Sequence, residues 1–326
     1  MTAVLAVDLG KTGCRATIWT GHADEPRLVR EVPGAPGLAV PDGVTSAAVA
    51  VVAAAASLLE DAEIGRLDAV CVGAAGAAAA PDAARALADR LLDRLPTDEV
   101  AVTSDAITAH AGALGAGTGV VLAAGTGAVA VGVGDGGVLA RVDGWGPWLG
   151  DEGSGAWIGL AGLRAALRAF DGRGADTALH QAAIDMFGEL GRLPLVLTEE
   201  NNPARTAASF APVVGRTAAA GDRVAAEIMG AAAAALGEAV IAAARQIGAS
   251  GPVPVAITGG LAGVGGPLLD PLRAVIAESG LSLTLQAPLG DPLDGARRLA
   301  LSSDLPHESF ITRIRHHTTI PAAPPR

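Results

Sequence analysis

Residues 7–14, VDLGKTGC, place an aspartate, a lysine and a threonine in a glycine-containing turn at the end of an apolar run. Small residues let backbone N–H groups approach an anion closely, and a threonine hydroxyl adds a further donor. A carboxylate beside phosphates repels them unless a cation lies between, so Asp8 is a candidate ligand of the Mg²⁺ that a nucleotide carries. The candidate phosphate-binding residues are Gly10, Lys11, Thr12 and Gly13.

A Walker loop or an ordinary hairpin could also account for this turn. A Walker loop needs a glycine five positions before its Gly-Lys, but Leu5 occupies that position and a second strand, not a helix, follows the turn. The sequence therefore excludes a Walker loop. An ordinary hairpin with a turn aspartate remains open. Lys11, the only lysine of the chain, favours the phosphate site because a compact ammonium suits a phosphate oxygen.

Two further glycine turns follow apolar segments later in the chain. Gly125-Thr126-Gly127 lies between two apolar runs, and no helix begins directly after it, so it is not a dinucleotide-binding fingerprint. As a partner of the first turn, it is a candidate to hold a phosphate chain. Gly259 and Gly260 end an apolar run and would let a flat group such as adenine lie against bare backbone. An ordinary strand-to-helix turn accounts for this pair equally well.

Asp105 stands where a predicted strand ends and a predicted helix begins. A carboxylate at that point is a candidate general base for a substrate hydroxyl, a role that contributes roughly 10²–10⁴-fold in rate. Capping of the helix by Ser104 or Asp105 is the alternative role.

The segment GWGPWLGDEGSGAWIG (144–159) is unusual because aromatic residues make up only 2% of the chain. Trp145 and Trp148 stand among glycines, directly ahead of two acidic residues. Apolar rings cover the C–H faces of a sugar, and carboxylates accept hydrogen bonds from its hydroxyls. The acids and Ser154 would also cap the helix that follows, which accounts for some of the segment but not for its tryptophans. We therefore interpret the segment as a sugar site.

The elements that must position these residues alternate between strands and helices, as in an α/β fold. We expect strands at 3–8, 14–19, 27–31, 68–73 and 99–103, on both sides of the Gly-Thr-Gly turn, and at 253–258 and 282–286. We expect helices at 45–60, 82–94, 105–113, 153–170, 177–187, 203–219, 222–248, 267–279 and 292–302. The strand–glycine turn–strand layout occurs twice, which predicts two similar halves with a ligand-binding cleft between them. The proline-ended stretch 307–326 is expected to be a loose tail.

Length and composition limit the classes of function. The 326 residues suffice for about two domains, and the net charge of -11 argues against a broad nucleic-acid or anionic-membrane surface. The apolar stretch 47–59 is too short to span a bilayer, and 225–244 is interrupted by two glutamates, so both are expected to be packed helices. The first residues do not read as a signal peptide, and two cysteines are too few for a disulfide framework. A cytoplasmic protein is expected.

Taken together, these segments resemble the N-acetylglucosamine kinase and BadF/BadG-type ATPase family, within the sugar kinase–actin–Hsp70 fold. VDLGKTGCRA and LAAGTGAVA look like its two phosphate loops, SDA like its catalytic-aspartate segment, and ITGGLA like its adenosine-side turn. GWGPWLGDEGSGAWIG and SFAPVVGRTAAAGDRVAAEI (209–228) look like further stretches of the same family. The resemblance covers nearly the whole chain.

The resemblance implies two ribonuclease-H-like domains that close on ATP·Mg²⁺ and a sugar. The first would comprise residues 1–104, completed by a C-terminal helix at about 290–326, and the second residues 105–289. By the motif match, Asp105 would deprotonate the 6-hydroxyl of the sugar and Asp8 would serve the metal. The residues implied to line the sugar are Asp105, Gly144, Trp145 and Asp151.

Two departures from the family pattern bear on the choice of sugar. Enzymes of the family that act on N-acetylglucosamine commonly follow Gly-Thr-Gly with serine and asparagine, where this chain has Ala128 and Val129. The GAPG segment at 34–37 also lacks the asparagine expected near it. A free ammonium prefers carboxylates to an amide partner, so we expect an ATP-dependent kinase of glucosamine ahead of N-acetylglucosamine.

The alternatives are a kinase of another hexose such as glucose or N-acetylmuramic acid, a BadF-type ATPase that drives electron transfer to a partner reductase, and a non-catalytic binding protein. A BadF-type ATPase needs cysteines for an iron–sulfur cluster, and the chain offers only Cys14 and Cys71, both in predicted strands. A homodimer is left open as the assembly.

Overall fold

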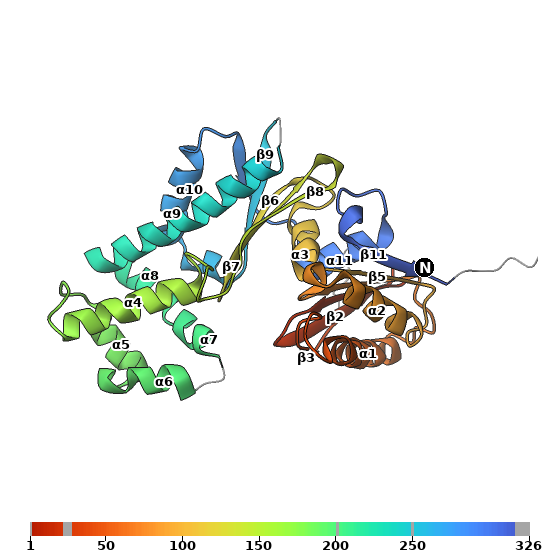
Figure 1. Ribbon diagram of the computed structural model, residues 1–326, viewed down its shortest axis with the longest axis horizontal. Coiled ribbons are helices and arrows are strands. Elements are labelled where there is room, and N and C mark those ends of the chain that lie inside the picture. The colour runs from red at the N-terminus through yellow and green to blue at the C-terminus, as the bar shows by residue number, and fades with distance from the viewer. Residues whose placement is uncertain (1, 22–27, 200–201, 249–250, 317–326) are drawn as a thin grey trace, which may run out of the picture. The chain divides into compact units, whose positions relative to one another are not determined.

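The computed structural model describes residues 2–21, 28–199, 202–248 and 251–316, and the chain divides into two compact units. The first unit comprises Met1–Gly117 together with Leu289–Arg326, and the second comprises Thr118–Pro288. Both ends of the chain therefore belong to the first unit, where red and blue ribbon occur together in Figure 1. The expected boundary after residue 104 precedes helix α3 (Asp105–Leu114), whereas the contacts group this helix with the first unit.

The first unit is built on a six-stranded sheet in the order β11-β5-β4-β1-β2-β3. Its strands are β1 (Val4–Leu9), β2 (Gly13–Trp19), β3 (Val29–Pro33), β4 (Ala69–Ala74), β5 (Glu99–Thr103) and β11 (Thr312–Arg315). Its helices, besides α3, are α1 (Gly43–Asp61), α2 (Pro81–Leu92) and α11 (Pro292–Leu301), with 3₁₀ segments η1 (Ala77–Ala79) and η5 (Glu308–Phe310). Helices α1 and α2 pack together on one face, and α3 and α11 pack together against β1 and β4 on the other (Figure 1).

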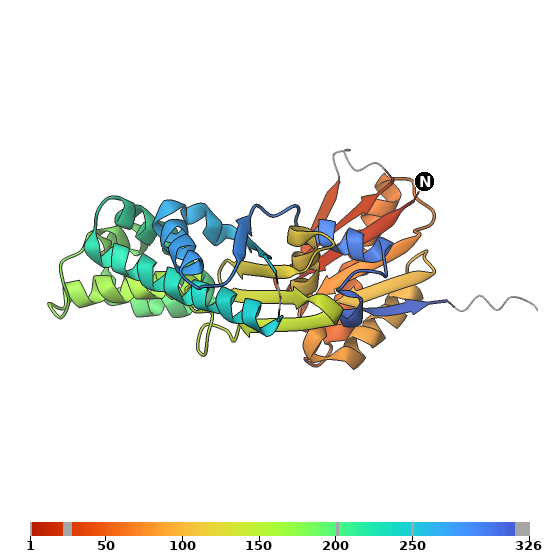
Figure 2. The same cartoon turned by 90° about the horizontal axis from the view of Figure 1, so that it is seen from above.

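The second unit is built on a five-stranded sheet in the order β10-β9-β6-β7-β8. Its strands are β6 (Gly119–Ala124), β7 (Ala128–Gly134), β8 (Val138–Asp143), β9 (Val253–Thr258) and β10 (Leu283–Gln286). Its helices are α4 (Gly155–Phe170), α5 (Leu179–Phe187), α6 (Leu193–Glu199), α7 (Pro203–Ala208), α8 (Ala211–Ala219), α9 (Arg223–Gln246) and α10 (Gly266–Ala277), with 3₁₀ segments η2 (Asp135–Gly137), η3 (Leu190–Arg192) and η4 (Gly260–Val264). The long helix α9 packs along β7 and β8, beside α10 (Figure 2).

Each unit has its own core of alanine, valine and leucine, as the scarcity of aromatic residues requires. The central strand β1 is buried along nearly its whole length, which explains why its sequence is continuously apolar up to Asp8. Among the described residues, α1 and α9 are the two helices long and apolar enough to cross a membrane by composition alone. In each, 44% of the most apolar window is buried, and α1 packs on β2 while α9 packs on β7, as core helices do.

The structure differs from the expected local structure in several places. The helix predicted at 203–219 is two helices, α7 and α8, because Pro212 near the start of α8 would clash with the carbonyl of Ala208 in a continuous helix. Strand β8 was not anticipated. This strand lies at the edge of the sheet and only one of its residues, Ala140, is buried, so its sequence lacks the buried apolar run by which the other strands were predicted. The strand expected at 27–31 is observed as Val29–Pro33, and Arg27 lies outside the described residues.

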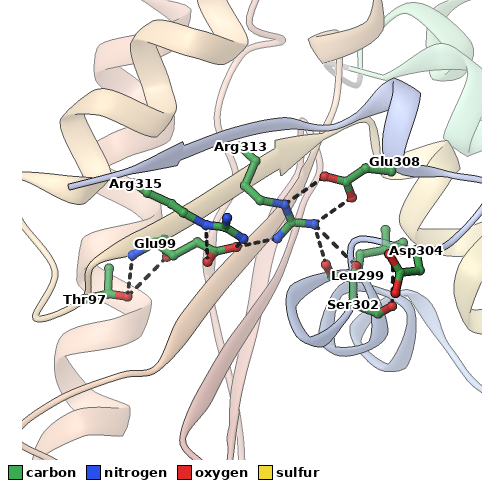
Figure 3. A network of polar contacts seen from close by, with 8 residues as sticks. All are labelled: Thr97, Glu99, Leu299, Ser302, Asp304, Glu308, Arg313 and Arg315. Carbon is green, nitrogen blue, oxygen red and sulfur yellow. Dashed lines mark hydrogen bonds and ion pairs between the residues drawn. The ribbon is translucent and has the colours of Figure 1, made fainter. Parts of the chain in front are cut away.

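A further correction concerns the stretch 307–326, which was expected to be a loose tail. Residues 312–315 form strand β11, which pairs antiparallel with β5 at the edge of the sheet (Figure 2). The Arg313 guanidinium donates to Glu99 at 2.7 Å, to both carboxylate oxygens of Glu308, and to the Leu299 carbonyl of α11 at 2.9 Å (Figure 3). This buried arginine therefore fixes β11 to β5 and α11. Residues 317–326, the rest of the predicted tail, lie outside the described residues.

Candidate active site

The first glycine turn joins β1 and β2 as a tight hairpin. Gly10 donates its N–H to the carbonyl of Gly13 at 2.9 Å, which leaves Lys11 and Thr12 exposed at the tip. The segment after β3 packs against this turn, where Ala35 donates to the Gly10 carbonyl at 3.2 Å. A side chain at Gly34 would approach that carbonyl to 2.4 Å, so glycine is required there for the close contact. The backbone of the turn is thus held in a fixed shape, as an anion site needs.

Asp8 is the second-last residue of β1, and the hairpin register places Arg15 directly opposite it. Arg15 lies 3.8 Å from the Asp8 carboxylate and donates to Asp291 at 3.0 Å. Burial raises the pKa of Asp8 to about 6; the nearby Arg15 lowers it, while the charges of Asp105 and Asp291 raise it further. The first unit therefore brings three acidic residues and one arginine to the carboxyl end of β1.

Asp291 is the N-cap residue of α11 and makes this arrangement rigid. Its Oδ1 accepts the backbone N–H groups of Leu293 and Asp294 at 2.9 and 3.1 Å, and Asp294 bonds back to its N–H in a capping box. Neither Arg15 nor Asp291 was expected at this site from the sequence. The register of a two-stranded hairpin could have identified Arg15, because residue 15 must face residue 8. Asp291 is 276 residues from Arg15, and no local pattern connects the two.

Asp105 opens helix α3, but it is not the residue that caps it. The N-cap is Ser104, whose hydroxyl accepts the N–H of Ile107 at 3.3 Å. The Asp105 carboxylate accepts the N–H of the adjacent Ala106 at 2.9 Å. Because Ser104 performs the capping role, helix capping no longer explains why an aspartate stands at position 105.

Helix α3 is held close to β1 and α11 by small residues. A side chain at Gly112 would approach the Asp291 carbonyl to 2.0 Å, and one at Gly295 would approach the Thr108 carbonyl to 1.8 Å. These contacts bring the C-terminal half of α3 against the first residues of α11, and both helices pack against β1. Asp8, the turn at 10–13 and Asp105 thus lie in one unit.

In the second unit, the Gly-Thr-Gly turn lies against the start of α4. Gly125 donates to the Gly127 carbonyl at 2.8 Å, and the carbonyls of Gly125 and Thr126 accept the first N–H groups of α4, at 2.8 and 3.1 Å. Gly259, with φ of 93°, would bring a side chain to 2.3 Å from the Ala124 carbonyl, so only glycine fits. The turns at 125–127 and 259–260 are therefore neighbours at the carboxyl ends of the parallel strands β6 and β9. This end of the strands is where α/β sheets bind ligands.

The segment 144–151 forms an irregular loop whose aromatic rings are open to solvent. Trp145 is 66% exposed and Trp148 is 86% exposed, in a chain with few aromatic residues. Arg141 of β8 contacts the loop at two points: its guanidinium donates to the Gly144 carbonyl at 2.5 Å and lies 5.3 Å from the centre of the Trp145 ring. Exposed flat rings on a fixed backbone suit the C–H face of a ligand.

Asp151 connects this loop to the Gly-Thr-Gly turn. Its carboxylate accepts the N–H of Gly146 at 3.1 Å and lies so close to Gly127 that a side chain there would approach it to 2.6 Å. Burial raises the pKa of Asp151, and the negative charge of Asp143 raises it further. Hydrogen bonds from backbone N–H groups and the charge of Arg141 lower the pKa, but the net shift is upward. The second unit thus brings together Gly144, Trp145 and Asp151 with the turn at 125–127.

The donor set fits a magnesium ion that arrives with its nucleotide. Within the part of the chain that the structure describes, no three His, Cys, Asp or Glu side chains are grouped to hold a metal by themselves. Mg²⁺ in kinase sites is commonly held by one or two carboxylates together with substrate phosphates and water. Asp8, half-buried beside the hairpin turn, can provide one such carboxylate.

Comparisons with known proteins find a matching family and similar curated proteins. Residues 5–289 match the model of the BadF/BadG/BcrA/BcrD ATPase family. The N-acetyl-D-glucosamine kinase of Dictyostelium discoideum is 31% identical over 208 residues, which cover 62% of this chain and 65% of that protein. The N-acetylmuramic acid/N-acetylglucosamine kinase of Clostridium acetobutylicum is 34% identical over 118 residues, which cover 36% of this chain and 38% of that one. The chain thus spans less than two thirds of the length of either curated relative.

Solved structures share the two-unit fold over almost the whole chain. A candidate N-acetylglucosamine kinase from Chromobacterium violaceum superposes with a TM-score of 0.69 and 27% identity, and covers 93% of this chain and 99% of that one. A ROK family glucokinase from Streptomyces griseus, in complex with glucose and AMPPNP, shares the fold with a TM-score of 0.54 and 18% identity, over 92% of this chain and 99% of that one. The expected sugar kinase–actin–Hsp70 fold class is confirmed. With the family model matched from residue 5 to residue 289, the chain belongs to the BadF/BadG/BcrA/BcrD ATPase family.

Proposed function

We propose that this protein is an ATP-dependent sugar kinase that transfers the γ-phosphoryl group of ATP to the 6-hydroxyl of an amino sugar, with glucosamine ahead of N-acetylglucosamine. The observation that carries the proposal is the grouping in the first unit of a phosphate-type hairpin turn, Asp8 and Asp105. The two carboxylates are close enough for the charge of Asp105 to raise the pKa of Asp8. A kinase needs one carboxylate for the metal of its nucleotide and another for the proton of its acceptor.

The two carboxylates stand on different elements, which suits two different roles. Asp105 stands at the half-buried start of a helix capped by Ser104, where it can accept the proton of a sugar hydroxyl as the phosphoryl group is transferred. Asp8 lies in β1, opposite Arg15 and beside the turn that carries Lys11 and Thr12. Mg²⁺ bound with ATP would neutralise charge on the phosphates and be held in part by Asp8. Lys11, Thr12 and the N–H groups of both glycine turns would bind the phosphates.

The sugar would be bound by the loop of the second unit. Trp145 offers an exposed ring, and the Asp151 carboxylate offers an acceptor for hydroxyl or ammonium hydrogen atoms. The N-acetyl-D-glucosamine kinase from Dictyostelium discoideum supports a sugar of this class, since the chain is 31% identical to it. Gly259 and Gly260 would lie on the adenosine side of the nucleotide.

The choice of glucosamine rests on the residues that follow the Gly-Thr-Gly turn. Ala128 is buried. The apolar side chain of Val129 lies against Gly144, where an added side chain would approach it to 2.9 Å. Neither residue can bond an acetamido group through its side chain. Asp143 at the end of β8 and Asp151 in the loop that follows are near one another, and their negative charges favour a positively charged substituent on the sugar.

An alternative ATPase function, linked to electron transfer, has less support from the structure. Cys14 and Cys71 are both buried, and burial raises the pKa of each thiol to about 12. An iron–sulfur cluster requires thiolates. Neither cysteine is therefore prepared to hold one.

The experiment that tests the proposal is a substrate panel. Initial ADP release would be measured with Mg·ATP and glucosamine, N-acetylglucosamine, glucose or N-acetylmuramic acid, and with no sugar. We expect glucosamine to give the highest kcat/KM and the sugar-free reaction to be slower by orders of magnitude. ADP release that is equally fast without any sugar would refute the kinase proposal. A preference for N-acetylglucosamine would refute only the choice of sugar.

A further inference from the structure

Asp143 has an unusual backbone conformation in the second unit. It is the last residue of β8 and has φ of 63°, in the left-handed region that residues other than glycine rarely adopt. Asp151, eight residues later, has φ of 55°. Strained residues of this kind persist where the surrounding structure holds them, and they concentrate at functional sites.

The side chain of Asp143 explains why the strained conformation is kept. One carboxylate oxygen accepts the backbone N–H of Asp151 at 2.8 Å, and the other accepts the N–H of Glu152 at 2.8 Å. The carboxylate is packed closely, because a side chain at Gly150 would approach it to 2.1 Å. The end of β8 is thus joined to the far end of the exposed loop by two charge-assisted hydrogen bonds.

Asp151 continues this chain of contacts. While its N–H is held by Asp143, its own carboxylate accepts the N–H of Gly146, the residue after Trp145. The same carboxylate lies against Gly127 of the Gly-Thr-Gly turn. Movement of the Asp151 backbone would therefore move the carboxylate and release the backbone beside Trp145.

We propose that Asp143 is a positioning residue for the sugar: by holding the N–H groups of residues 151 and 152, it fixes the Asp151 carboxylate and the Trp145 ring where the sugar binds. The inference rests on the proposed function, since it assigns the sugar to Trp145 and Asp151. Because both of its oxygens already accept backbone hydrogen bonds, we assign Asp143 no contact with the sugar. It acts through the geometry of the loop.

The test is Asp143→Gly, because glycine accepts the left-handed conformation and the substitution removes the side chain with its two acceptor oxygens. If the role of residue 143 were purely conformational, this substitution would leave the protein unchanged or more stable. A matched control is Asp42→Gly, which makes the same change at an aspartate with φ of 58° whose side chain makes no capping hydrogen bond. Asp143→Asn is the conservative variant, since its single carbonyl oxygen can replace one of the two acceptors.

Two readouts are measured on the full chain. Hydrogen–deuterium exchange at the amides of residues 151 and 152, without ligand, should become at least about tenfold faster in Asp143→Gly and stay unchanged in Asp42→Gly. The KM for the sugar should rise roughly 10–100-fold, as expected when binding groups are misplaced by about 1 Å, while the KM for ATP stays within about twofold. Asp143→Asn should give a smaller increase in both exchange and sugar KM.

Unchanged hydrogen–deuterium exchange in Asp143→Gly would overturn the proposal. The proposal would also be overturned if exchange became faster in Asp143→Gly but its KM for the sugar stayed unchanged, while Trp145→Ala and Asp151→Asn raised the KM for the sugar. Failure of the proposed function would look different. In that case Trp145→Ala and Asp151→Asn would themselves leave the sugar KM unchanged, whatever Asp143→Gly does to exchange.

Discussion

The buried arginine of the C-terminal strand should contribute far more to stability than its exposed neighbour. Arg313 and Arg315 both lie on β11 and both bond Glu99, but the Arg313 side chain is 9% exposed and that of Arg315 is 62% exposed. Arg313 also bonds Glu308 and the carbonyls of Leu299 and Ser302, which Arg315 does not (Figure 3). The bonds from Arg315 and Arg313 outweigh burial and lower the pKa of Glu99, so this acid is charged at neutral pH.

The magnitudes follow from this difference in burial. The Glu99 and Glu308 carboxylates are 19% and 31% exposed, and Glu99 also bonds Arg315, so loss of Arg313 leaves partly solvated charges. Hydrogen bonds to charged groups contribute about 1.5–3 kcal/mol, whereas an exposed ion pair contributes about 0.2–1 kcal/mol. We therefore expect Arg313→Ala to lower the free energy of unfolding by about 1.5–3 kcal/mol and Arg315→Ala by less than about 1 kcal/mol. For a domain of this size, the first change corresponds to a decrease in Tm of roughly 3–12 °C.

The assay is urea unfolding followed by far-UV circular dichroism. The free energy of unfolding, obtained from the midpoint and the slope m, is compared among wild type, Arg313→Ala and Arg315→Ala. Arg313→Lys should fall between the two alanine variants, because an ammonium cannot reproduce the planar fork that bonds two carboxylates and two carbonyls. If Arg313→Ala and Arg315→Ala cost the same, the idea that a buried network anchors β11 and α11 would be refuted.

Three further predictions concern pH, nucleotide and sugar. Burial and the neighbouring His110, 2.9 Å away, lower the pKa of His307 from 6.5 to about 4, so the folded state binds fewer protons than the unfolded state as pH falls below 6.5. The free energy of unfolding should decrease by about 2 kcal/mol between pH 7 and pH 5 from this residue, and an equal decrease in His307→Leu would contradict the assignment. Lys11→Ala should raise the KM for ATP with little change in the KM for the sugar; a change in the sugar constant alone would mean that the hairpin turn serves the sugar. Adding sugar should change the tryptophan fluorescence, and Trp145→Ala should abolish most of that change, whereas a signal retained in full would assign it to Trp148 or Trp157.

The features that the sequence predicted are those that depend on neighbouring residues. The apolar run that ends at Asp8, with its glycine turn and the return strand, is local, and so is the Gly-Thr-Gly turn between β6 and β7. The helix expected at 222–248 was also recognisable, because Asp222 is a typical N-cap and a long alanine-rich repeat follows. Composition alone required alanine and valine cores.

The features that the sequence did not predict depend on contacts between distant segments. Asp291 reaches Arg15 because α11 packs on β1 and α3, an arrangement that no local pattern encodes. Strand β11 is only four residues long, next to a proline-rich end, and it is held as much by the Arg313 side chain as by pairing with β5. The role of Asp143 was missed for a different reason. An aspartate at the end of a strand reads as a turn residue, and its left-handed conformation is visible only in the folded chain.

The most direct test of the central proposal is the turnover of Asp105→Asn, measured as initial ADP release at saturating glucosamine and Mg·ATP. Asparagine keeps the shape of the side chain but cannot take the hydroxyl proton, so turnover should fall by roughly 10²–10⁴-fold while both substrates still bind. Ser104→Ala is the matched control: it removes the N-cap of the same helix and should cost about 0.5–2 kcal/mol in stability, with turnover close to wild type well below its Tm. A kinase with Asp105 as its base predicts a large loss in the first variant and not in the second. Near-normal turnover of Asp105→Asn would contradict it.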